Sequence, residues 1–174
     1  MKIAVKLAFD EQAALRLLNW LAQENARLLR ARPELPLLYD SGVVYRRETD
    51  ETWCDYLNML AQGHEDCDGL ASARAGELIA KGWKALRPGD GGFAEARRRK
   101  PTSIPAEVML TTRTGVDSPG LYHCVVRYRV GTTWHRDDPS KRLGMNGPVQ
   151  PDVRRRWATV AAETTTAEAV WRTA

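Results

Sequence analysis

The chain has no long apolar run, and it contains few cysteines and few aromatic residues. No segment approaches the run of about 18 apolar residues that a membrane-spanning helix needs, so we expect no membrane association. Lys6 interrupts the apolar N-terminal segment, and no small-residue cleavage site follows it. That pattern differs from a signal peptide, and we expect a cytoplasmic protein that is not secreted by that route.

The small number of cysteines argues against a disulfide framework. The three cysteines, Cys54, Cys67 and Cys124, form an odd set in a chain of 174 residues. Small secreted proteins usually carry even numbers of cysteines in paired spacings. The set therefore indicates a reducing compartment, or thiols that are kept for chemistry.

The composition is that of one globular domain spanning residues 1–174. Hydrophobic residues make up 43% and charged residues 28% of the chain, and the net charge is +4. A chain of this length can bury a substantial core. Its basic runs at 97–100 and 154–156 lack interleaved aromatic residues. This disfavours a nucleic-acid partner, since base stacking needs aromatic side chains between the cations.

Periodicity and end signals predict helices in the first half and strands in the second. Apolar residues at helical spacing from 66 to 81 are followed by Gly82, a typical helix stop. The remaining predicted helices are 10–30, about 50–62 and 151–174, with a helical turn at 93–99, and the predicted strands are 2–9, 107–113, 121–130 and 133–138. Because strands and helices do not alternate, we predict an α+β fold with an antiparallel sheet.

Cys67 lies in the first turn of the predicted 66–81 helix, on its apolar face. The helix dipole and the backbone N–H groups there favour a thiolate, which is the reactive form of cysteine. The flanking Asp66 and Asp68 oppose that effect. A cationic partner would therefore stabilise the thiolate more than the dipole alone.

The predicted strand 121–130 supplies such a partner. Alternation places Cys124 on its apolar face and His123 on the opposite, more polar face. A turn centred on Val130 and Gly131 would place Asp138 directly opposite His123, with Asp137 pointing to the other face. Cys67, His123 and Asp138 then supply a nucleophile, a base and an orienting carboxylate. The backbone N–H of Cys67 would form part of an oxyanion hole.

The order of these residues resembles the transglutaminase-like (papain-like) superfamily. In that superfamily a cysteine opens a helix of small residues, and a strand histidine, Gly, Trp and Asp-Pro-Ser/Thr follow. The matching residues here are DCDGLASARAGEL at 66–78, His123, Gly131, Trp134 and Asp138-Pro139-Ser140. The resemblance covers about 63–145. It implies Cys67, His123 and Asp138 as the catalytic triad, thioester chemistry on amide or acyl substrates, and no metal or other cofactor.

A narrower resemblance is to small transglutaminase-like proteins encoded by tailed phages. It rests on YDSGVVYRRE at 39–48, on Trp53 and on GHEDC at 63–67. It implies a phage-encoded protein in the host cytoplasm or the virion, with a protein or peptide substrate and other phage structural proteins as partners. An upstream tryptophan donates to the oxyanion in some relatives, which implies that role for Trp53, although packing is the commoner role of Trp. Val125 departs from the family, which often has an aromatic residue there.

Two alternatives remain beside this hypothesis. A zinc site would draw on nominal ligands, but no Cys-x-x-Cys pair occurs and His123 and Cys124 point to opposite faces. The nominal ligands are Cys54, His64, Cys67, His123, Cys124 and His135. The other alternative is a structural or interaction subunit of a phage particle that keeps the fold without catalysis. We expect amide hydrolysis by a peptidase or amidase, with transamidation as a less favoured outcome.

Overall fold

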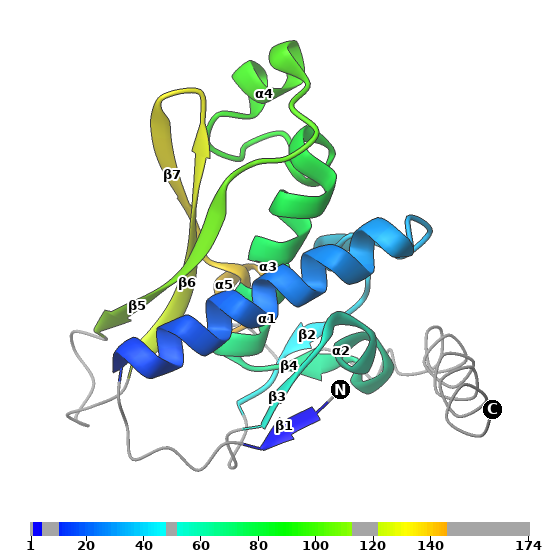
Figure 1. Cartoon of the computed structure of the whole chain (residues 1–174), viewed down its shortest axis with the longest axis vertical. Helices are drawn as coiled ribbons and strands as arrows, with labels where there is room; N and C mark the ends of the chain where they lie inside the picture. The colour runs from blue at the N-terminus through cyan, green and yellow to red at the C-terminus, as the bar shows by residue number, and fades with distance from the viewer. Residues whose placement is uncertain (1, 5–10, 48–51, 113–121, 146–174) are drawn as a thin grey trace.

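The structure is a computed structural model that describes residues 2–4, 11–47, 52–112 and 122–145 (Figure 1). The predicted helix at 151–174, the basic run at 154–156 and the end of the predicted strand 2–9 lie outside the described residues. The described elements follow in chain order. They are β1 (Lys2–Ala4), α1 (Glu11–Ala31), η1 (Leu38–Asp40), β2 (Val44–Tyr45), β3 (Thr52–Cys54), α2 (Tyr56–Gln62), β4 (His64–Glu65), α3 (Cys67–Lys81), η2 (Gly82–Ala85), α4 (Phe93–Arg99), β5 (Ala106–Thr112), β6 (Tyr122–Val130), β7 (Thr133–Asp137) and α5 (Pro139–Arg142).

The architecture is α+β, as predicted, with helices packed on a small antiparallel sheet. Helix α3 is central: it contacts α1 on one side and strands β5 and β6 on another (Figure 1). Its small residues permit this close packing. A Cβ added to Gly76 would lie 2.7 Å from the Asn25 Cβ and 2.8 Å from the Ala22 carbonyl oxygen of α1.

Strands β5, β6 and β7 form the predicted three-stranded antiparallel sheet. The alternation on β6 is confirmed, because Cys124, Val126 and Tyr128 belong to the core that also contains α3 residues. On the opposite face, Arg127 and Arg129 are exposed, whereas His123 and Val125 are buried. Toward the Val130 end of β6, the sheet thus has a core face toward α3 and an outer face away from it.

The predicted register between β6 and β7 was wrong by two residues. Val130 pairs with Thr133 and Val126 with Asp137, so the loop consists of Gly131 and Thr132. Gly131 has a φ of 59°, a left-handed conformation that glycine adopts without strain and that allows this tight loop. A shift of two residues leaves every side chain on its predicted face.

The second helix begins later than predicted. Thr52–Cys54 forms β3, which pairs antiparallel with β1, and the helix starts at Tyr56. Asp55 caps it, because its side chain accepts a hydrogen bond from the Asn58 backbone N–H at 3.0 Å. The sequence prediction missed this because the pairing strand lies some 50 residues earlier in the chain, which local periodicity cannot reveal.

Candidate functional site

Cys67 is the first residue of α3, as the sequence predicted. Asp66 is the N-terminal cap, with extended backbone angles and a side chain that accepts from the Asp68 backbone N–H at 3.4 Å. Cys67 is partly buried and packs against the core cluster that contains Cys124. The capped helix start therefore brings the thiol to β6.

His123 and Asp138 lie together, although not as a directly opposed pair on neighbouring strands. The His123 Nε2 atom lies 3.0 Å from both carboxylate oxygens of Asp138. Asp138 follows the last residue of β7 and caps α5, accepting from the Lys141 backbone N–H at 3.2 Å. Because the ladder ends at Asp137, the α5 turn and not the strand pairing holds the carboxylate near His123.

The neighbouring Cys124 thiol has the largest influence on the pKa of Cys67. Together with His123 it lowers that pKa to about 4, although burial opposes the shift. The proximity of Cys67, followed by burial, raises the pKa of Cys124, so that thiol stays protonated beside a Cys67 thiolate.

The pKa of His123 is raised, first by the neighbouring Cys67 side chain and then, against burial, by Asp138. Since Nε2 faces Asp138, the other ring nitrogen, Nδ1, is the one left for Cys67. The thiol, the imidazole and the carboxylate come from α3, from β6 and from the start of α5. Their opposite pKa shifts favour a thiolate–imidazolium pair.

Trp53 lies beside this group, but its indole N–H already has an acceptor. It donates to the Asp68 Oδ2 atom at 2.6 Å, and the Trp53 side chain is buried in the core. Burial, followed by the hydrogen bond to Asp66, raises the pKa of Asp68 well above its usual range. Donation from Trp53 to an oxyanion would require the bond to Asp68 to break first.

A buried ion cluster centred on Arg74 was missed by the sequence prediction, which treated Arg74 only as an exception in an apolar series. Arg74 is fully buried and pairs with Glu77, with Asp137 at 2.9 Å and with Asp90 at 3.1 Å. Arg142 also reaches Asp137, at 3.1 Å. The cluster anchors the residue that precedes Asp138 and so positions the carboxylate that contacts His123. A charged residue inside an apolar helix series is the signal that indicates such a cluster.

Potential metal ligands gather at one place in the described ranges of the chain. Oxygens of Glu65, Asp66 and Asp68 lie within 4.8 Å of one another, and none of the residues considered for zinc belongs to this group. Glu65 already accepts a hydrogen bond from the Cys54 thiol at 2.7 Å. His135 lies elsewhere, on the core face of β7, against Gly91 and Gly92. The three acidic residues alone do not define a metal site.

Comparison with protein-family models, curated proteins and solved structures finds no match to this chain. In the parts of the chain that the structure describes, no helix has the length and apolar character to cross a membrane.

Proposed function

We propose that the protein is a cysteine-dependent enzyme that cleaves or exchanges amide bonds through a thioester. The observation that carries the proposal is the convergence of Cys67, His123 and Asp138, with the Cys67 pKa lowered and the His123 pKa raised. More particularly, the resemblance stated above suggests a transglutaminase-like enzyme of the tailed-phage type. The α+β architecture and the helix-start position of Cys67 support that assignment.

In the proposed reaction, the Cys67 thiolate attacks the amide carbonyl carbon, and the negative charge moves to the carbonyl oxygen. The backbone N–H of Cys67, at the positive end of α3, stabilises that charge. Protonated His123 gives its proton to the amide nitrogen as the C–N bond breaks, which leaves a thioester on Cys67. Asp138 holds the ring and stabilises the imidazolium.

Water then attacks the thioester carbon while neutral His123 accepts its proton. The C–S bond breaks, the carboxylic acid departs and the Cys67 thiolate returns with protonated His123. An amine in place of water would give transamidation through the same steps. Hydrolysis is the simpler outcome because it needs no second binding site.

The pH dependence of alkylation by iodoacetamide tests the proposal. We expect Cys67 to react well below pH 8, with its rate falling only as the pH approaches about 4, because the folded structure stabilises the thiolate. Cys54 and Cys124 are buried and should react far more slowly. Mass spectrometry of peptides gives the rate at each cysteine in one experiment.

His123→Ala is the matched variant, because it removes the imidazolium and leaves all three thiols in place. The alkylation midpoint of Cys67 should then move upward by at least one pH unit, toward the usual range of thiols of about 8.5. If Cys67 reacts no faster than Cys54 in the native chain, or if His123→Ala leaves its midpoint unchanged, the proposal is wrong. Circular dichroism of the variant verifies that the fold is retained.

A further inference from the structure

The outer face of the sheet carries an exposed group of arginines around one tryptophan, which we call the arginine strip: Arg127, Arg129, Trp134 and Arg136. The register pairs Arg127 with Arg136 and Arg129 with Trp134 across β6 and β7. Directly paired residues share a face of the sheet. All four are exposed, and Trp134 keeps 48% of its accessible surface.

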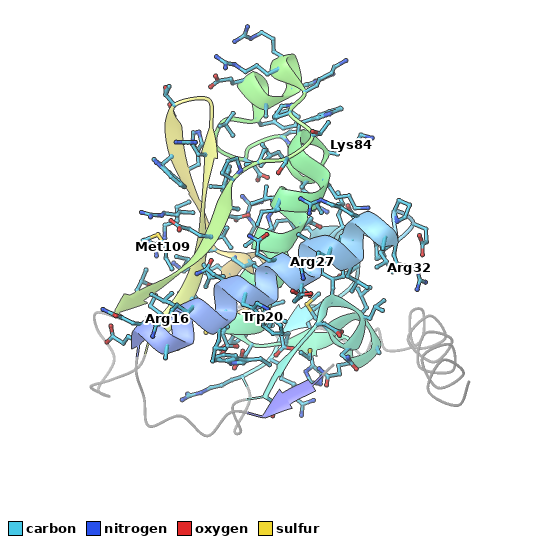
Figure 2. All side chains as sticks on the ribbon, in the orientation of Figure 1. Arg16, Trp20, Arg27, Arg32, Lys84 and Met109 are labelled. Atoms are coloured by element: carbon cyan, nitrogen blue, oxygen red, sulfur yellow. The ribbon has the colours of Figure 1, made fainter. Side chains whose placement is uncertain are left out.

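The strip belongs to the face directed away from α3. Met109 of β5 pairs with Val125 and therefore shares this face, and its labelled side chain extends from the side of the sheet away from α3 (Figure 2). The strip is therefore not part of the core. Trp134 and the arginines are exposed at this end of the face, whereas Val125 and His123, further along β6 on the same face, are buried.

The strip has an excess of positive charge. Its three arginines face one acidic residue, Glu107, which forms an ion pair with Arg127. In the described ranges, no carboxylate pairs with Arg129 or Arg136. Guanidinium groups match carboxylates in a bidentate geometry, so the strip has the charge and the donors to hold further carboxylates.

The Trp134 ring holds the guanidinium groups of two arginines in place. The Arg127 and Arg129 guanidinium carbons lie 4.8 and 5.6 Å from the centroid of its ring. These cation–π contacts hold both guanidinium groups over the indole and reduce the entropy lost on binding. They also occupy the ring that a nucleobase would need for stacking. The arrangement therefore favours carboxylates over bases.

The strip runs away from the candidate site on the same strand and the same face. His123, Arg127 and Arg129 are separated by even numbers of residues on β6, so alternation directs their side chains to one side. At about 3.3 Å per residue, Arg127 and Arg129 lie about 13 and 20 Å from His123 along the strand.

We propose that the arginine strip binds an acidic segment of the polypeptide substrate, at a distance along β6 from His123 of about 13 to 20 Å. That this polypeptide is the substrate rests on the proposed function, whereas the binding of acidic polypeptide to the strip does not. The strip would thus select the substrate by charge, at a distance from the chemistry.

Fluorescence anisotropy with a fluorescein-labelled deca-glutamate peptide tests the strip. All measurements use the full-length Cys67→Ala chain at one fixed ionic strength, so no reaction can occur. We expect binding that Arg129→Gln/Arg136→Gln weakens about tenfold, because two solvent-exposed charge pairs are lost. The matched control, Arg97→Gln/Arg98→Gln, removes the same charge from exposed positions of α4, and we expect a change smaller than about twofold.

Three results would overturn the proposal. They are no binding of deca-glutamate, equal weakening by the two double variants, and tighter binding of a labelled ten-residue oligothymidylate that depends on Arg129 and Arg136. The last result would make the strip a nucleic-acid site. None of them bears on Cys67 reactivity, so failure of the strip and failure of the proposed enzyme chemistry remain distinguishable.

Discussion

Replacement of Arg74 by methionine tests whether the buried ion cluster supports the fold. Arg74 pairs with Glu77, Asp90 and Asp137, and its guanidinium also donates to the Ala85 carbonyl oxygen at 2.8 Å. Although burial opposes its charge, Glu77 and the other acidic neighbours raise the pKa of Arg74, which stays protonated. Arg74→Met keeps much of the side-chain length and leaves Glu77 buried without its cation, whereas Asp90 and Asp137 keep their ion pairs with Arg142.

The expected loss is large because the Glu77 carboxylate is fully buried and cannot reach water. Removal of one partner from a buried ion pair costs about 3–5 kcal/mol. With a urea dependence of about 2 kcal/mol per molar, the unfolding midpoint should fall by about 2 M. Urea unfolding followed by circular dichroism measures the shift.

Arg27→Met is the matched control, because Arg27 also pairs with a glutamate three residues away on a helix. Its side chain is 74% exposed, and its partner is Glu24 at 2.6 Å. An exposed pair of this kind contributes about 0.2–1 kcal/mol. A midpoint shift for Arg74→Met no larger than that for Arg27→Met would refute the reasoning.

The free energy of unfolding that Arg74→Met loses should also depend on pH. Burial raises the pKa of Glu77, and Arg74 opposes that rise in the native chain. Without Arg74 the pKa rises further, so the folded state binds a proton more readily than the unfolded state. The free energy lost in the variant should therefore be largest near neutral pH and should shrink as the pH falls toward 5.

Two further substitutions test local packing. Trp53→Phe keeps an aromatic ring but removes the N–H that donates to Asp68. We expect the free energy of unfolding in urea to fall by about 1–3 kcal/mol, because a buried carboxyl loses its donor. An unchanged urea midpoint would contradict this expectation. Gly76→Ala should lower the thermal midpoint, because the added Cβ meets α1 backbone and side-chain atoms at a cost of about 1–3 kcal/mol. Helix propensity alone favours alanine by about 1 kcal/mol, so a higher midpoint would contradict the close packing of α1 and α3.

The elements that the sequence predicted well are those with local determinants. The boundaries of α3 follow from the Asp66 cap, the apolar spacing and Gly82, and all of these are visible in one window of residues. The alternation on β6 likewise separates Cys124 from Arg127 and Arg129 in the sequence alone. By contrast, β3 depends on pairing with β1, and no local pattern marks it.

The sequence by itself determined which residues begin and end α3 and which face of β6 packs in the core. It also determined the positions of the Cys67 thiol, the His123 imidazole and the Asp138 carboxylate along the chain. Only the tertiary structure decided that Asp138 reaches His123 from the cap of α5, that Asp68 takes the Trp53 N–H, and that Arg74 gathers acidic residues from distant segments. The physical reason is the separation along the chain over which each kind of interaction acts. Capping and alternation act between residues a few positions apart, whereas hydrogen bonds and ion pairs in the core depend on elements that fold together from the whole chain.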